Sequence, residues 1–164
     1  MNDIVAVGVD GSPASRTALE YAVAEAARRR GRLRVIVGVR PPEYWAMAYG
    51  LAAPASTPDL LDQARAEAHA MLDEVLASRP ADAHVLHTTV EAHAGIPAEV
   101  LVEASREADV LVVGHRGRGG LASTLLGSVG LHCVLHACCP VTIVRGTPVA
   151  ETMVAEPAMV TDRS

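Results

Sequence analysis

The chain has no phenylalanine among its 164 residues, and its aromatic residues are three tyrosines and one tryptophan. A core without large rings must be built from Val, Leu, Ile and Ala, which suits a parallel sheet covered by alanine-rich helices. The sequence has no apolar run long enough for a membrane-spanning helix. Its net charge of −5 argues against broad electrostatic binding to nucleic acid or to anionic membranes.

Cysteine is also scarce, and the three thiols crowd near one end as Cys133, Cys138 and Cys139. An odd, clustered set does not form a disulfide framework, and the first residues lack the basic region of a secretory signal. These features predict a cytoplasmic protein. Cys138 and Cys139 are interpreted as small buried hydrophobic residues rather than as a redox pair.

The spacing of residues near these cysteines suggests a metal site, but the rest of the sequence argues against one. His132, Cys133 and His136 share one predicted helix, but no second motif supplies the remaining ligands at a recognisable spacing. We therefore predict no metal site and interpret the two histidines as residues of a helix surface.

Apolar runs alternate with helical patterns along most of the chain. The predicted strands cover residues 4–9, 33–39, 84–90, 109–113 and 141–144. The predicted helices lie between them and start at Pro13, Thr57, Pro97 and Ser128. This order predicts an α/β fold, an open parallel sheet with helices on both faces. One domain is expected over residues 1–146, followed by a disordered tail over residues 147–164.

The first helix carries clear signals at both ends. Ser12 is expected to cap its start, with Pro13 at the first helical position. Basic residues end it at Arg28 to Arg30, and Gly31 is expected to stop it.

The most informative segment lies behind the fourth predicted strand, where six of the thirteen glycines fall between Gly114 and Gly130. A strand that ends in glycines and leads into a helix allows close approach of a phosphate to backbone N–H groups. In parallel sheets, ligands bind beyond the carboxyl ends of the strands. Asp10, Val39 and Gly114 all follow such ends, so the sequence places an acidic turn, a long loop and the glycines at one edge.

At these residues the chain resembles the universal stress protein family, in its ATP-binding branch. The resemblance is carried by Gly114-x-x-Gly117, nine residues, then Gly127-Ser128. Further matches are the segments Val9-Asp10-Gly11-Ser12, Gly95-Ile96-Pro97-Ala98 and His136-Ala137-Cys138-Cys139-Pro140-Val141. It implies a five-stranded Rossmann-like sheet of order 3-2-1-4-5 that binds ATP between the ends of the first and fourth strands.

The resemblance also implies a role for individual residues. Asp10 is expected at the nucleoside, the backbone of Val39 at adenine, and Gly127, Ser128 and Val129 at the triphosphate. The complete set of expected nucleotide-binding residues is Gly8, Val9, Asp10, Val39, Val113, Gly114, His115, Gly117, Arg118, Gly127, Ser128 and Val129. Mg²⁺ is expected only through the phosphates.

Two positions depart from the family pattern. Gly130 stands where binding members usually carry Ser or Thr, which removes one hydroxyl expected at the phosphates. His115 stands where many members carry Ser, which would place a titratable group beside the site.

Simpler interpretations stay open for several residues. Asp10 alternatively closes a turn, since Asp-Gly-Ser is good turn chemistry. Arg116 and Arg118 either screen phosphate charge or are solvated loop residues. The loop of residues 40–57 holds Tyr44, Trp45 and Tyr49, which either fold over adenine as a lid or form an ordinary surface loop.

The expected function is a nucleotide-responsive regulatory module with at most slow ATP hydrolysis, because the Lys-Ser/Thr ending of a P-loop is missing. The alternatives are an adenine-nucleotide α-hydrolase-like enzyme and a nucleotide-free module that only dimerises. The last strand, Val141, Thr142, Ile143 and Val144, is a sheet edge in the implied order. An edge without charge or internal proline predicts a homodimer with antiparallel pairing of the two final strands.

Overall fold

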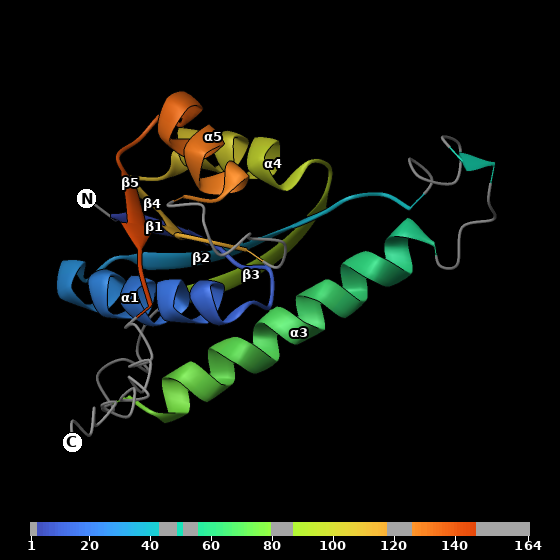
Figure 1. Ribbon diagram of the computed structural model, residues 1–164. Helices are drawn as coiled ribbons and strands as arrows, with labels where there is room; N and C mark the ends of the chain where they lie inside the picture. The colour runs from blue at the N-terminus through green and yellow to red at the C-terminus, as the bar shows by residue number, and fades with distance from the viewer. Residues whose placement is uncertain (1–2, 43–48, 51–55, 80–86, 118–125, 147–164) are drawn as a thin grey trace, which may run out of the picture.

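The computed structural model describes residues 3–42, 49–50, 56–79, 87–117 and 126–146. Its elements run in the alternating order expected from the sequence (Figure 1). The strands are β1 (Ile4–Gly8), β2 (Arg32–Val39), β3 (His87–Ala94), β4 (Val110–Gly114) and β5 (Val141–Val144). The helices are α1 (Pro13–Arg29), α3 (Thr57–Ala77), α4 (Pro97–Ala104) and α5 (Ser128–His136), with a short 3₁₀ turn at Ser105–Glu107.

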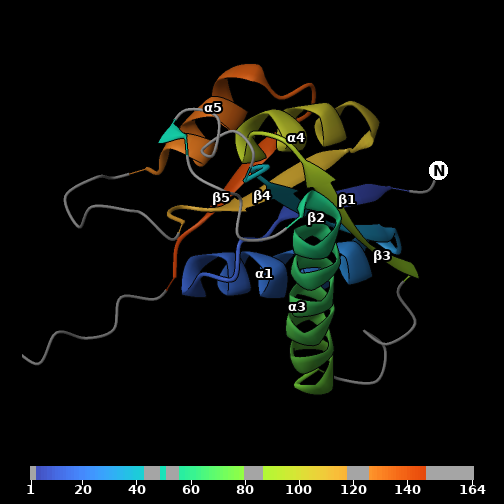
Figure 2. The ribbon, with the colours of Figure 1, turned by 90° about the vertical axis from the view of Figure 1, so that its right-hand side faces the viewer.

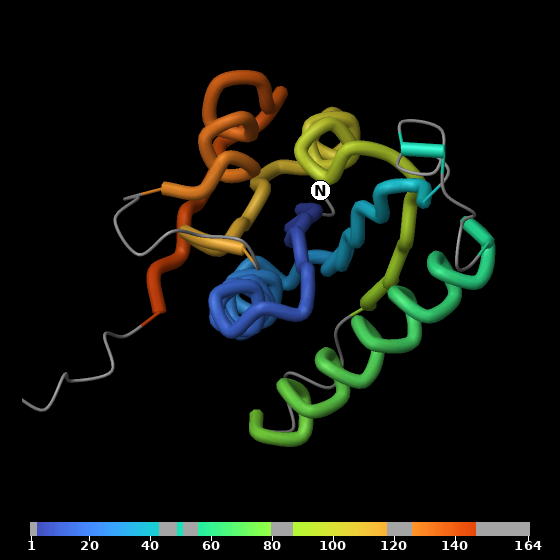
Figure 3. Tube along the Cα trace, turned by 45° about the vertical axis from the view of Figure 1, so that its right-hand side comes forward, coloured from blue at the N-terminus to red at the C-terminus, as the bar shows by residue number. Residues whose placement is uncertain are grey.

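All strand pairings are parallel, and the sheet has five strands in the order β3-β2-β1-β4-β5. This arrangement confirms the predicted fold class and strand order. Helices α1 and α3 cover one face of the sheet, whereas α4 and α5 cover the other (Figure 3). Viewed after a quarter turn, α3 runs beside the β3 edge, and α5 lies over the β4–β5 end (Figure 2).

The two cores arise from the alternation of side chains along each strand. In β1, Val5 and Val7 face α1 and α3, whereas Ala6 faces α4 and α5. In β4, Val112 and Leu111 divide in the same way, and both are fully buried. Central strands buried on both faces explain why these segments read as continuous apolar runs.

The ends of α1 confirm one predicted signal and correct another. Ser12 caps the start, and its Oγ accepts a hydrogen bond from the Ser15 N–H at 3.2 Å. At the other end Arg30, not Gly31, adopts the left-handed conformation, with φ of 52°. Gly31 is needed for a different reason, since a Cβ there would lie 2.1 Å from the Asp3 carbonyl oxygen.

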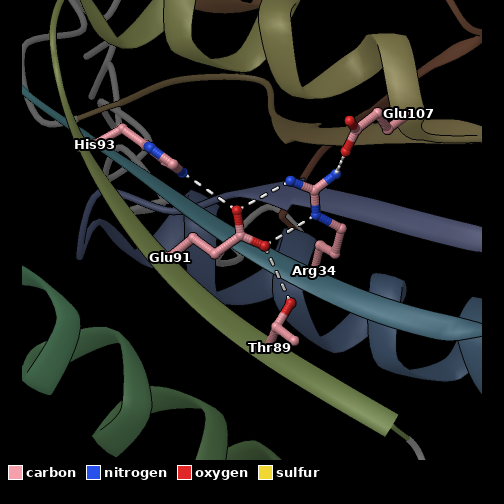
Figure 4. Close-up of polar contacts among 5 residues, drawn as sticks. All are labelled: Arg34, Thr89, Glu91, His93 and Glu107. Carbon is pink, nitrogen blue, oxygen red and sulfur yellow. Dashed lines mark hydrogen bonds and ion pairs between the residues drawn. The ribbon is translucent and has the colours of Figure 1, made fainter.

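The third strand lies closer to the C-terminus than the sequence pattern predicted. It was predicted over residues 84–90, of which 84–86 lie outside the described residues, and it continues to Ala94. Thr89 puts a polar group in the predicted segment, and Glu91 and His93 put polar groups in the part of the strand that lies beyond it. Glu91 pairs with Arg34 of β2 through two hydrogen bonds of 2.9 Å (Figure 4). Pairing along the whole of β2 therefore extends β3 despite its polarity.

Some predictions fall outside what the structure describes. Tyr44 and Trp45 of the expected lid lie outside the described residues, and so does the tail at 147–164. The lid and the disordered tail therefore remain predictions. Within the described part of the chain, no helix is long and apolar enough to span a bilayer.

Candidate functional site

A cleft of about 440 Å³ opens at the carboxyl ends of β1 and β4, between the starts of α4 and α5. Residues from the ends of β1, β2 and β4 and from the starts of α1, α4 and α5 meet there because parallel strands end at the same edge of the sheet. Most of the residues predicted for nucleotide binding line this cleft: Gly8, Val9, Asp10, Val113, Gly114, Gly117, Gly127, Ser128 and Val129.

Asp10 lies at the end of β1 and has two roles in the local structure. Its Oδ1 accepts a hydrogen bond from the Ser12 N–H at 2.9 Å, which closes the turn at Gly11, where φ is 81°. Its Oδ2 faces Gly117, since a Cβ at residue 117 would lie 2.7 Å from that oxygen. The turn-forming interpretation is thus correct, and the same carboxylate still lines the cleft.

Two other glycines of the motif serve packing as well as the cleft. A Cβ at Gly114 would lie 2.7 Å from the Ala14 carbonyl oxygen, so the start of α1 requires glycine there. Gly127 approaches residues 115–117 closely, with its N–H donating to the His115 carbonyl at 2.8 Å. The glycine spacing therefore holds the loop after β4 against both flanking helices.

Two of the helices that start at the cleft, α4 and α5, have no side-chain cap, unlike α1 and α3. Ser12 and Ser56 cap α1 and α3, whereas Gly127 before α5 and Ile96 before α4 offer no capping hydrogen bond. The first N–H groups of a helix have no acceptor within the helix, and they carry its positive pole. The start of α5, together with the Ser128 hydroxyl and the lining Arg116, is thus chemically suited to an anion.

Other predicted site residues lie elsewhere. His115 is not among the lining residues, and it serves the fold through its backbone N–H, which donates to the Val144 carbonyl at 2.9 Å. Its Nδ1 is buried without a hydrogen-bond partner in the described part of the chain. Arg118 lies outside the described residues. The structure therefore does not bring a histidine to the cleft wall.

Position 130, which lacks the hydroxyl usual in the family, faces apolar side chains. A Cβ at Gly130 would lie 2.9 Å from Leu126 Cδ1 and 3.5 Å from Ile143 Cδ1. A small shift of the Leu126 side chain would make room for a Cβ, so this packing does not by itself require glycine. A serine at this position would project toward these apolar side chains.

A second cavity of about 620 Å³ adjoins the cleft, on the side of α3. The two share the lining residues Val9, Asp10, Gly38 and Pro97. Val39 lines this second cavity rather than the cleft, and its carbonyl already accepts a hydrogen bond from the Gly95 N–H at 2.8 Å. A base that meets Val39 would therefore lie in the α3 cavity.

From β2, sequence reasoning named only Val39, and it missed Gly38 and the residues of α4 in these walls. A Cβ at Gly38 would lie 2.6 Å from Pro97 Cα, and one at Gly8 would lie 2.6 Å from Leu101 Cδ1. A glycine inside an apolar strand is a sign of close backbone approach, and this signal was available in the sequence. What could not be foreseen is that α4 makes both approaches.

The cysteine and histidine residues of α5 lie apart from the cleft. The rings of His132 and His136 lie 4.5 Å apart, and Cys133 is fully buried, which raises its pKa to about 11. All three cysteines are free thiols, but Cys138 is exposed and Cys139 is only partly buried, so the interpretation of these two as buried residues was wrong. Among the described residues, no group of three or more side chains could hold a metal ion.

Comparison with known proteins identifies relatives over nearly the whole chain. Residues 1–145 match the profile of the universal stress protein family. The chain is 34% identical over 153 residues to universal stress protein Rv1996 of Mycobacterium tuberculosis, covering 88% of this chain and 48% of the relative. The chain thus spans about half the length of the curated relatives it matches.

Two solved structures extend the similarity to three dimensions. UspA from Lactobacillus plantarum aligns with a TM-score of 0.64 and 26% identity, over 87% of this chain and 97% of the other. A universal stress protein described in complex with cAMP aligns with a TM-score of 0.57 and 28% identity, over 88% of this chain and 98% of the other. Together with the cleft and the strand order, these matches show that the chain belongs to the universal stress protein family.

Proposed function

We propose that this protein binds ATP in the cleft between β1 and β4 and acts as a nucleotide-responsive regulatory module. One observation carries the proposal: the Asp10 carboxylate and the uncapped start of α5 line the same cleft. The first suits the hydroxyls of a ribose, and the second suits phosphate. The relative described in complex with cAMP supports a nucleotide as the ligand.

Charge determines how the nucleotide lies. A triphosphate is repelled by Asp10 and attracted by Arg116 and by the N–H groups of Ser128 and Val129. The ribose therefore lies at Asp10, and the phosphates extend along Gly117 and Gly127 to the start of α5. Mg²⁺ would bind through the phosphate oxygens.

Binding rather than turnover is the proposed activity. Asp10 is the one carboxylate among the described residues that line the cleft, and it is held by the Ser12 N–H. Neither it nor another described lining residue is placed as a general base for an attacking water. We place the protein in the cytoplasm, since its three cysteines are free thiols.

Mass spectrometry of small molecules released from the freshly purified protein, with calorimetric titration of ATP, tests the proposal. We expect adenine nucleotide in the released fraction, or ATP binding by the emptied protein. Incubated ATP should remain largely intact. Stoichiometric release of AMP and pyrophosphate would instead indicate an α-hydrolase-like enzyme. A protein that releases no nucleotide and does not bind ATP would refute the proposal.

We also propose that two copies pair through β5. Among the described strands, β5 pairs only with β4, so its outer side is an open edge. Helix α5 beside it exposes Leu131, Val134 and Leu135 by 50%, 51% and 66%. A partner that covers both features would bury apolar surface and satisfy backbone groups together.

Symmetry explains why the partner would be a second copy. Antiparallel pairing of two identical edge strands requires a two-fold axis perpendicular to the sheet, which keeps both α5 helices on the same face. Gly130 faces Ile143 of β5, and Val134 lies one turn farther along that side of α5. The exposed side chains of the two α5 helices would therefore face each other across the axis.

A further inference from the structure

The cavity on the α3 side is mostly apolar, with a few polar groups. Its walls are formed by Val9, Val37 and Val39 from the sheet, and by Leu60, Ala64, Ala68 and Met71 from α3. Its volume of about 620 Å³ lies within the usual range for small-molecule sites. Because it shares Asp10 with the cleft, a nucleotide whose ribose lies at Asp10 would place its base in this cavity.

Two polar side chains of α3, both exposed to solvent, line the same cavity and contact each other. Gln63 and Glu67 lie four residues apart on one helical face, and Gln63 Nε2 donates a hydrogen bond to Glu67 Oε1 at 2.9 Å. A carboxylate only accepts hydrogen bonds, so the amide nitrogen, not the amide oxygen, must face Glu67. Glu67 thereby favours one orientation of the Gln63 amide.

We propose that Gln63 recognises the purine base and that Glu67, as a positioning residue, makes it select a 6-aminopurine over a 6-oxopurine. When the N–H that lies away from the amide oxygen donates to Glu67, the oxygen and the other N–H remain side by side. This pair matches the 6-amino donor and the neighbouring ring-nitrogen acceptor of adenine. The inference rests on the proposed function, which supplies the nucleotide.

The competing base shows why the orientation matters. A 6-oxopurine presents the inverted pair, with an acceptor at O6 and a donor at N1–H. To pair with it in the same position, the Gln63 amide would have to turn over and point its oxygen at the Glu67 carboxylate. Two acceptors facing each other would lose the hydrogen bond and repel. The carboxylate thus penalises the oxopurine without contacting the base.

The test compares the affinities of the full chain for ATP and for inosine triphosphate, which differ at position 6 and in the protonation of N1. The parent should prefer ATP by about tenfold or more, the discrimination expected of a bidentate amide–base pair. Gln63→Leu should weaken ATP toward the affinity for inosine triphosphate. His69→Leu is the matched control, because His69 is exposed on α3 and does not line the cavity.

Glu67→Gln separates orientation from packing. The replacement has nearly the same shape, but an amide both donates and accepts, so Gln63 becomes free to turn over. Affinity for inosine triphosphate should rise severalfold, with ATP affinity changed by less than about twofold. Asp73→Asn, an exposed replacement on α3 outside the cavity, should change neither affinity.

The inference is overturned if the parent binds both nucleotides equally, or if Gln63→Leu keeps the parent's preference. One form of the second outcome is that Gln63→Leu weakens both nucleotides by the same factor, which would indicate a packing role only. In each of these cases ATP still binds, so the proposed function stands. A parent chain that binds neither nucleotide refutes the proposed function and this inference together.

Discussion

The Asp10 carboxylate lies directly against Gly117, at the place where a Cβ on residue 117 would come 2.7 Å from Oδ2. Real Cβ atoms do not approach an oxygen so closely, so any side chain at 117 must displace the carboxylate. Asp10 cannot move freely, because its other oxygen holds the Ser12 N–H. The absence of a side chain at Gly117, the second glycine of the motif, therefore leaves room for the Asp10 carboxylate at the cleft.

Gly117→Val should weaken ATP binding by about 1–3 kcal/mol or more, since it displaces a charged hydrogen-bond acceptor and narrows the phosphate path. Displacing Asp10 can also break its hydrogen bond with the Ser12 N–H, so the free energy of unfolding should fall by at most about 1 kcal/mol, the loss expected for Asp10→Ala. Calorimetric titration and thermal unfolding measure the two effects. Gly146→Val is the matched control, because a Cβ there would meet only Thr17 Oγ1 at 3.8 Å. Parental ATP affinity in Gly117→Val would place the site elsewhere.

The two roles of Asp10 can be separated by two replacements. Asp10→Asn keeps an oxygen that can accept from the Ser12 N–H, whereas Asp10→Ala removes it. Both should weaken ATP by about 1–3 kcal/mol if the charged carboxylate contacts the nucleoside. Only Asp10→Ala should also lower the free energy of unfolding, by about 1 kcal/mol. An Asn variant with parental affinity would reduce Asp10 to a turn-forming residue.

The fold was predictable because its central strands are almost entirely apolar, so each appears in the sequence as a continuous hydrophobic run. β1 and β4 are buried on both faces, and Ser12-Pro13 marks the start of α1 without ambiguity. β3 was misplaced because it is polar and is held by pairing along β2, where Glu91 contacts Arg34, 57 residues away in the sequence. The hydrophobic pattern of a short segment contains no information about pairing between residues so far apart in the sequence.

The candidate site was predictable at its glycines but not in its walls. Gly114, Gly117 and Gly127 follow a spacing that the sequence displays. The contributions of Gln63 and Glu67 depend on where α3 packs, and those of Gly38 and Pro97 on how α4 approaches β2. Tertiary packing also turned His115 away from the cleft, although its neighbours Gly114 and Arg116 line it.

The ion pair of Glu91 with Arg34 predicts a loss of stability in acid. Hydrogen bonds from Arg34 hold the pKa of Glu91 at about 2, below its ordinary value of 4.5, despite an opposing effect of burial (Figure 4). A lowered pKa contributes stability that is fully present above pH 4.5 and is lost as the pH falls toward 2. Since Glu91 is 28% exposed, we expect about 1–3 kcal/mol rather than more.

Urea unfolding of the parent and of Glu91→Gln at several pH values between 6 and 2 measures this contribution. The variant should be less stable near neutral pH, and the difference should shrink as the pH falls. Glu25, whose pKa is also held at about 2 by Arg28 and Arg29, loses its contribution in both proteins and cancels in the comparison. Asp73→Asn, exposed on α3, serves as the control. A constant difference across this range would contradict the assignment.

The open edge of β5 leads to a prediction about individual backbone groups. The carbonyls of Pro140 and Val144 accept hydrogen bonds from Leu111 and His115, so they face β4. Because backbone groups alternate along a strand, Thr142 also faces β4, whereas Val141 and Ile143 point their N–H and C=O groups to the free edge. A proline at 141 thus removes a donor that β4 does not use, whereas a proline at 142 removes one that it does.

Val141→Pro should therefore convert a dimer into a monomer while the protomer stays folded. Leu131→Glu should have the same effect, because it places a charge in the contact between the two α5 helices. Thr142→Pro, the contrasting replacement, should lower the melting temperature, because it breaks the β4–β5 pairing. Light scattering should give about twice the 17.1 kDa chain mass for the parent at micromolar concentration and the single-chain mass for the first two variants. A parent that is monomeric under these conditions, or a Val141→Pro variant that remains dimeric, would show that β5 is not the contact. Backbone donors and the apolar side of α5 act at the same edge, so both variants must dissociate the dimer if that edge is where the copies meet.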